Sequence, residues 1–187
     1  MDSGLKKISD IFQGEVIFTI PQYQRSYSWE EKQWNEFYED LLYHNINLKY
    51  FFGTLLLKEA GKEKAFRLIE VVDGQQRTTT ITIFINVLLY LLEKKGSEKE
   101  LDLLKARYIN SFNRYKLRPI DADDVTFFHT YVLQIESETK SFSKPSQGRL
   151  YAAKIHFLNK LKELDLAMLE SFLEKIENAE ILTYLVN

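Results

Sequence analysis

Residues 73–80 hold most of the polar side chains in this chain that could do chemistry together. They read DGQQRTTT, which places a carboxylate, a glycine, two amides, an arginine and three hydroxyls in succession. Arg77 can offer a planar, permanently charged fork to a phosphate. Gly74 lets the backbone come close to a ligand because it has no Cβ. These residue types predict a turn that binds a phosphate group.

The segments on either side of this turn predict a strand that leads into a helix. Residues 66–72 alternate and are β-branched, as in a half-buried strand, whereas the apolar run 81–92 is too long and too rich in leucine for a strand. The first turn of a helix has N–H groups without intrahelical acceptors and lies at the positive end of the helix dipole. The turn is therefore expected to form an anion site at the start of a buried helix.

Composition and charge favour a globular cytoplasmic protein. The chain has 187 residues, of which 45% are hydrophobic, enough for one domain or one domain with a helical extension. A net charge of −2 argues against a generally basic protein that coats nucleic acid, although a local basic groove stays open. The absence of cysteine excludes disulfides and thiolate metal sites. The start resembles no signal peptide and the longest apolar run is short of a membrane span, so we expect no membrane association.

The residues before the turn predict a mixture of helices and strands. A helical face formed by Leu5, Ile8, Ile11 and Phe12 predicts a short first helix that ends at Gly14, and residues 15–20 predict a strand that stops at Pro21. Ser28 and Glu31 have the spacing of a capping box, which predicts a second helix that opens near Trp29.

The apolar run 51–58 predicts a central strand that is covered on both faces, with Gly53 marking a bend or a close backbone approach. A turn at residues 60–64 should join this strand to the strand 66–72 in a hairpin. After the long helix, the sequence predicts a helix at 97–109 that is capped by Ser97 and then an extended link at 114–118. Asp121 should cap a helix at 122–134, which is followed by a mobile loop at 137–148. Two more helices within 150–176 and a final strand at 181–187 complete the prediction.

Two of these stretches resemble the signature motifs of a known family. Residues 20–29, IPQYQRSYSW, and residues 72–80, VDGQQRTTT, resemble those of the N-terminal domain of GmrSD-type restriction endonucleases, which is related to the ParB and sulfiredoxin-like fold. Residues 51–57, FFGTLLL, look like the central strand of that family. The resemblance covers most of the chain and is sharp from about residue 17 to residue 92.

The resemblance implies an α+β fold with a small mixed sheet, a buried helix after the DGQQR turn and a mainly helical C-terminal portion. We expect residues 1–96 to form a ParB-like core that binds a nucleoside triphosphate (NTP). Residues 97–187 would be a helical extension of the same domain, truncated relative to a longer protein.

The function that the resemblance implies is a nucleotide-dependent sensor and NTPase domain of a modification-dependent, phage-defence restriction system. In such systems a separate C-terminal nuclease module of the His-Asn-His type cuts the DNA. Here His44, His129 and His156 are scattered, and the chain has no such motif. We therefore expect nucleotide and DNA as partners, with the nuclease module supplied in cis or in trans.

Residue by residue, the resemblance predicts that the loop at 23–25 faces the turn at 73–78 across a shared pocket. Arg25 and Arg77 would bind the polyphosphate, Gln75 or Gln76 would orient the attacking water, and Asp73 would hold Mg²⁺ directly or through water. The expected catalytic residues are Asp73, Gln76 and Arg77, and the expected nucleotide-binding residues are Tyr23, Gln24, Arg25, Gly74, Gln75 and Thr78.

Several of these features have simpler alternatives. Asp73 could cap the helix, and Arg77 could form a surface ion pair. Tyr23, Tyr27 and Trp29 could stack on a base or pack against the core. The basic residues at 105–118 could contact DNA phosphates or form a solvated helix face. Two other functions also stay open: a non-catalytic DNA-sensing or interaction module, and a nuclease within the ParB-like fold.

Overall fold

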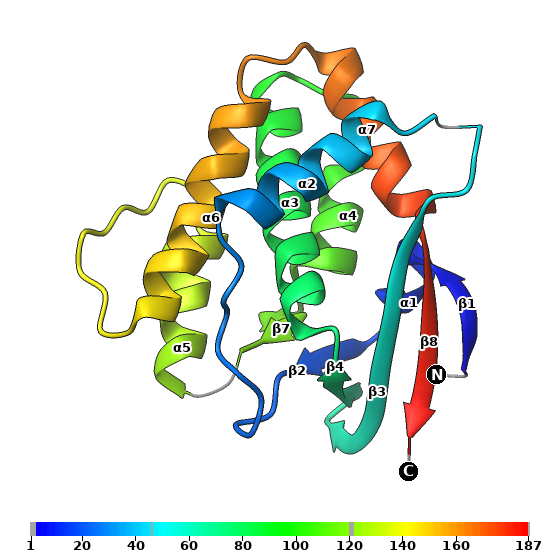
Figure 1. The fold of residues 1–187 in the computed structure, drawn as a ribbon, viewed down its shortest axis with the longest axis vertical. Helices are drawn as coiled ribbons and strands as arrows, with labels where there is room; N and C mark the ends of the chain where they lie inside the picture. Colours follow the sequence, from blue (N-terminus) through cyan, green and yellow to red (C-terminus); the bar gives the residue numbers. More distant parts are fainter. Residues whose placement is uncertain (1–2, 46, 120–121, 187) are drawn as a thin grey trace.

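The computed structural model describes residues 3–45, 47–119 and 122–186, with the backbone alone for residues 122 and 123. Its helices gather on one side of a curved mixed sheet (Figure 1). Across the sheet the described strands are β1 (Gly4–Lys7), β8 (Glu180–Val186), β3 (Phe51–Glu63), β4 (Phe66–Asp73), β2 (Val16–Thr19) and β7 (Leu117–Arg118). β1 with β8 and β3 with β4 are antiparallel pairs, and the other neighbours are parallel. The α+β class is therefore confirmed.

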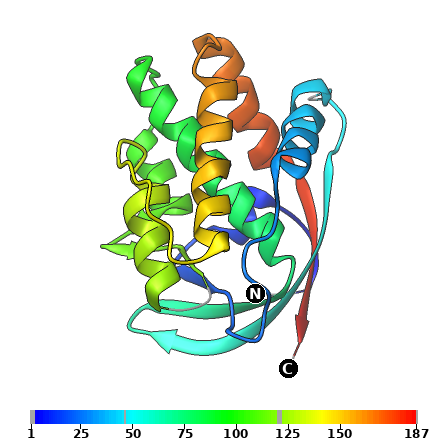
Figure 2. The same cartoon turned by 60° about the vertical axis from the view of Figure 1, so that its left-hand side comes forward.

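Helix α3 (Gln75–Lys94) is buried along most of its length at the centre of the helical layer (Figure 2). Its Phe84 ring lies 5.3 Å from that of Phe37, 5.2 Å from that of Phe157 and 5.8 Å from that of Phe172. The buried helix after the turn is confirmed. The other described helices are α1 (Ile8–Ile11), α2 (Glu31–Tyr43), α4 (Leu101–Tyr108), α5 (Ala122–Phe127), the π-helical η1 (Phe128–Leu133), α6 (Pro145–Leu161) and α7 (Leu166–Asn178).

The sheet combines both ends of the chain. β8 lies between β1 and β3, and β7 lies at the far edge beside β2. Residues after position 97 therefore supply two strands of the sheet as well as helices. A small separate hairpin of β5 (Asn110–Ser111) and β6 (Arg114–Tyr115) comes just before β7.

The predicted short first helix is present as α1, but it begins at Ile8, and Leu5 is not part of it. Residues 4–7 form β1, and Leu5 is exposed on it. β1 pairs with β8 at the opposite end of the chain. Local spacing could not reveal this pairing because the partner strand is remote in the sequence.

The hairpin of β3 and β4 is confirmed, but β3 continues through the predicted turn as far as Glu63. Leu55 and Leu57 are buried against the helices, whereas Thr54 and Leu56 are half-buried on the other face. The strand is central but fully covered on one face only, because the helices lie on one side of the sheet.

Three predicted helix starts are shifted. Glu30, and not Ser28, is the N-cap of α2, and its N–H donates to Gln33 Oε1 at 2.9 Å. α4 begins at Leu101 after Glu100, so the capping role predicted for Ser97 is wrong. α6 begins at Pro145, inside the predicted loop, and proline is favoured at the first helical position. Asp121, the expected cap of the following helix, lies outside the described residues.

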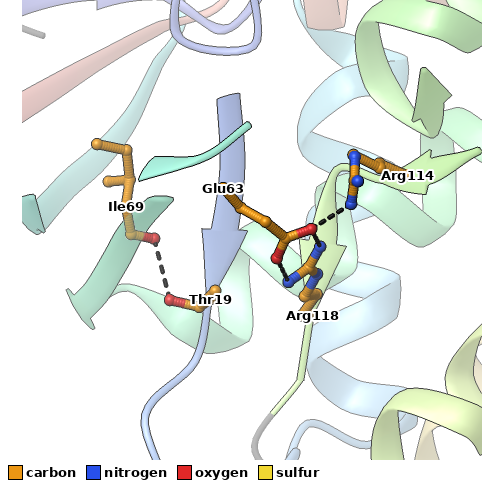
Figure 3. A network of polar contacts seen from close by, with 5 residues as sticks. All are labelled: Thr19, Glu63, Ile69, Arg114 and Arg118. Carbon is orange, nitrogen blue, oxygen red and sulfur yellow. Dashed lines mark hydrogen bonds and ion pairs between the residues drawn. The ribbon is translucent and has the colours of Figure 1, made fainter. Parts of the chain in front are cut away.

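The end of β3 is tied to the segment around β7 by an ion-pair network (Figure 3). Arg118 binds the Glu63 carboxylate with two nitrogens, at 2.7 and 3.1 Å, and Arg114 binds the same carboxylate. This network stabilises the part of the sheet that is remote from the start of α3. Within the described part of the chain, no helix is long and apolar enough to cross a membrane.

Candidate functional site

An open cleft of about 430 Å³ lies where β4 passes into α3, which is within the usual size range of ligand pockets. The loop between β2 and α2 forms its other wall. The cleft is lined by Gln24, Arg25, Trp29, Asp73, Gly74, Gln75, Gln76 and Arg77. The structure therefore brings together seven of the nine predicted site residues, all except Tyr23 and Thr78, and it adds Trp29.

Gly74 forms the corner between the strand and the helix. Its φ of +95° is in the left-handed region, and a Cβ here would lie 2.3 Å from Leu55 Cδ2 and 3.2 Å from the carbonyl oxygen of Thr54. Glycine is required both by this conformation and by this close approach. Because Gly74 offers no side-chain cap, the first N–H groups of α3 have no intrahelical acceptor, and residues 75–77, which carry them, line the cleft.

Two arginines line this cleft. Nη1 of Arg77 donates to the carbonyl oxygen of Thr54 at 3.0 Å, and Arg25 lies on the exposed loop. Neither arginine has an ion pair with any residue that the structure describes. Cations beside the positive end of a helix dipole repel it, and α3 has no acidic residue in its first turn. An anion in the cleft would relieve that repulsion.

The two neighbouring glutamines have different surroundings. Oε1 of Gln76 accepts the N–H of Ser28 at 2.7 Å, and its Nε2 donates to the carbonyl oxygen of Ser26 at 3.2 Å. Both ends of this amide therefore hold the loop against α3. Gln24 adds a bond from Nε2 to the carbonyl oxygen of Val72 at 2.6 Å.

Gln75 is buried, with 8% of its surface exposed, and it lines both the cleft and a smaller adjoining pocket. Over the described residues its amide has no hydrogen-bond partner in the protein. Gln75 is thus the glutamine whose polar atoms are available to a ligand.

The aromatic residues of the first motif divide in the same way. The Tyr27 hydroxyl lies 2.7 Å from Thr80 Oγ1 and accepts Trp34 Nε1 at 2.9 Å, and burial raises the pKa of Tyr27. Tyr27 therefore belongs to the core. Tyr23 is 70% exposed and lies outside the lining of the cleft, whereas Trp29 is half-buried and lines it.

Asp73 is exposed at the end of β4 and lines the cleft, again with no ion pair in the described part of the protein. Thr78 is buried, and its hydroxyl donates to the carbonyl oxygen of Gly74 at 3.1 Å, so it does not reach the cleft. Of the three histidines, His44 follows the end of α2, His129 lies on η1 and His156 lies on α6. No group of three or more His, Asp or Glu side chains suited to a metal ion occurs among the described residues.

Sequence reasoning missed the contribution of Thr54, whose carbonyl oxygen holds Arg77. No side-chain pattern signals such a backbone acceptor. The pocket beside the cleft includes Asp124, Ser146 and Leu150 from the C-terminal half, which no local motif associates with the turn. Gly53 was the detectable signal, because a glycine inside an apolar strand often marks a close backbone approach.

The model of the GmrSD restriction endonuclease N-terminal domain family matches residues 8–186, nearly the whole chain. The chain belongs to this family. No curated protein matches it. Membership in the GmrSD N-terminal domain family gives the chain a DNA restriction and phage-defence context. The family also suggests DNA, and a C-terminal nuclease module in a longer protein, as partners.

Proposed function

We propose that this GmrSD-type domain binds an NTP in the cleft at the start of α3 and hydrolyses it, as the sensor of a modification-dependent restriction system. The observation that carries the proposal is electrostatic. Arg25, Arg77 and the uncapped start of α3 line one cleft, and neither arginine is ion-paired within the described residues. Asp73 is the one carboxylate in the lining of this cleft, and a polyphosphate would supply the further negative charge that two arginines and a helix start can bind.

The proposed roles follow from what each side chain already contacts. Arg25 and Arg77 would bind the polyphosphate, since phosphoryl transfer is catalysed mainly by positioning and by charge neutralisation. Gln75 would orient the attacking water, because its amide is available. The catalytic role predicted for Gln76 becomes an indirect one, because both ends of its amide hold the loop that carries Arg25.

Asp73 fits a magnesium ion that is shared with a nucleotide. Mg²⁺ is commonly held by one or two carboxylates together with substrate phosphates and water, so a single exposed carboxylate beside the phosphate site is sufficient. When bound, the ion would neutralise charge on the phosphates. Without a nucleotide we expect Mg²⁺ to bind weakly.

We further propose that residues 1–96 form the nucleotide-binding core and that residues 97–187 extend the same domain. DNA recognition and cutting would then require the nuclease module of a longer protein, in cis or in trans.

The decisive experiment measures phosphate release from ATP, GTP, CTP and UTP with Mg²⁺ and with EDTA. Arg77→Ala should abolish turnover without unfolding the protein, because it removes a charge from the cleft. Arg67→Ala is the matched control, since Arg67 lies on β4 outside the lining of the cleft and its side chain pairs with that of Glu59 at 3.7 Å. Unchanged turnover in Arg77→Ala would refute the role of Arg77.

Two other outcomes separate the alternative functions. Nucleotide or DNA binding without phosphate release would indicate a non-catalytic sensing module. Nicking of supercoiled plasmid by the chain alone would indicate a nuclease within the fold. A thermal-shift titration with each NTP tests binding directly, because a ligand that binds only the folded state raises its stability.

A further inference from the structure

Gly53 interrupts β3 next to the cleft. Its φ is +99°, a value that residues with side chains rarely adopt, and the pairing of β3 with β8 shifts register between Phe51 and Thr54. The strand is thus locally distorted at Gly53. Glycine adopts such a φ without a steric penalty, so the distortion leaves a stretch of backbone without a side chain that another group can contact.

The contact is with the guanidinium of Arg77. A Cβ on Gly53 would lie 3.0 Å from Cζ, 3.0 Å from Nη2 and 3.2 Å from Nη1 of Arg77. These near-equal distances mean that the face of the guanidinium lies over the bare Cα. The next residue completes the arrangement, because the carbonyl oxygen of Thr54 accepts Nη1 at 3.0 Å.

No carboxylate in the described part of the protein forms an ion pair with Arg77, including Asp73, which lines the same cleft. Asp40 Oδ2 accepts the hydroxyl of Tyr50 at 2.6 Å, and Arg77 forms no ion pair with it. Arg77 is therefore held by the carbonyl of Thr54 and by contact with the backbone of Gly53. Both contacts are neutral, so the positive charge of Arg77 and its other N–H donors are available to a ligand.

We infer that Gly53 is a positioning residue, a side-chain-free seat on β3 that holds the guanidinium of Arg77 toward the cleft. The expected effect on NTP binding rests on the proposed function, whereas the contact between Gly53 and Arg77 does not. The central strand thereby sets the position of an anion-binding group that belongs to α3.

Gly61 provides a matched control on the same strand. Its φ is +105°, it also lies at a register shift, and a Cβ there would meet nothing within 4 Å. Gly53→Ala and Gly61→Ala therefore impose similar backbone strain, but only the first places a methyl group against Arg77.

The first test is a crystal structure of each variant without ligand. We expect Arg77 to leave the Thr54 carbonyl in Gly53→Ala and to stay in place in Gly61→Ala. An unmoved Arg77 in Gly53→Ala would overturn the inference. If Gly53→Ala fails to fold, recovery of folding in Gly53→Ala/Arg77→Ala supports the seat, and failure of that double variant, with Arg77→Ala folded, overturns it.

The second test is the affinity for a non-hydrolysable NTP analogue with Mg²⁺, measured by calorimetry. Displacing one charge-assisted contact should weaken binding roughly tenfold or more in Gly53→Ala and by less than about twofold in Gly61→Ala. In an Arg77→Ala background, Gly53→Ala should add less than about twofold, because it acts through the arginine. An equal loss in both backgrounds would show that Gly53 acts elsewhere.

The two tests can fail separately. If the wild-type protein does not bind the non-hydrolysable NTP analogue with any of the four bases, the proposed function fails, and the ligand-free structures still decide whether Gly53 positions Arg77. If the wild-type protein binds but the coupling with Arg77 is absent, the inference fails and the proposed function stands.

Discussion

Two regions of the molecule are rich in cationic side chains, and they use them in opposite ways. In the basic segment at 105–118 each cation has a partner within the protein. The pairs are Lys105 with Glu93, Arg107 with Glu177, Arg114 and Arg118 with Glu63, and Lys116 with the carbonyl oxygen of Gly14. In the cleft, Arg25 and Arg77 have no ion pair with the described residues, and they lie at the positive end of α3.

The difference separates cations that hold the fold from cations that can bind an anion. The arginines that share Glu63 hold the edge of the sheet together, which favours a structural role for the basic segment over a DNA-binding one. Unpaired arginines at a helix start oppose the dipole and so destabilise the free protein slightly. Sites that trade stability in this way are common where a protein binds ligands.

The largest expected effect is a reversal between the two regions. Arg77→Ala should lower NTP turnover by roughly 100-fold or more, while the melting temperature of the ligand-free protein stays within about 3 °C or rises. Arg118→Ala should do the opposite, with turnover changed by less than about twofold and a lower melting temperature, because Glu63 loses its bidentate partner. Phosphate release and calorimetric melting of both variants check this. Equal effects of the two variants on turnover would break the comparison.

The two glutamines should reproduce the same contrast within one motif. Gln76→Ala should destabilise the protein by roughly 1–3 kcal/mol, because the Ser28 N–H and the Ser26 carbonyl lose their partner. Gln75→Ala should leave the free energy of unfolding within about 0.5 kcal/mol and lower turnover by roughly tenfold or more. Urea denaturation and phosphate release measure both quantities. A larger stability loss in Gln75→Ala than in Gln76→Ala would reverse the assignment.

The glutamines also mark how far sequence reasoning could go. The strand, the turn and the buried helix were predictable because each depends on local pattern, and the motifs identified the cleft residues. The choice between Gln75 and Gln76 was not predictable, since two identical adjacent side chains differ only in what the distant loop brings to them. The β1–β8 pair and the acceptor on Thr54 escaped for the same reason, because long-range backbone contacts leave no side-chain signature.

The stability that the Glu63 network contributes should depend on pH. The hydrogen bond from Arg118, together with the charges of Arg118 and Arg114, holds the pKa of Glu63 below its ordinary value of 4.5. A carboxyl with a lowered folded-state pKa stabilises the protein above its unfolded pKa and loses this contribution as the pH falls through the folded value.

Glu63→Gln should therefore be less stable than the wild-type protein near pH 7. The difference should shrink below about pH 4.5 and disappear once the carboxyl is protonated in the folded protein. Urea denaturation of both proteins between pH 3 and pH 7 measures it. A stability difference that stays constant across this range would mean that Glu63 contributes through packing and not through its charge.

The smallest expected effect comes from Tyr23, which shares a motif with Arg25 but lies outside the lining of the cleft. Because its ring is 70% exposed, Tyr23→Ala should change the melting temperature by less than about 2 °C and the NTP affinity by less than about twofold. Trp29→Ala is the informative partner, since Trp29 lines the cleft and should lose affinity if its ring contacts the ligand. Calorimetric titration of both variants compares them directly. If Tyr23→Ala loses as much NTP affinity as Trp29→Ala, the ligand also contacts the tip of the loop. Tyr23 would then be a ligand-binding residue and not merely an exposed one.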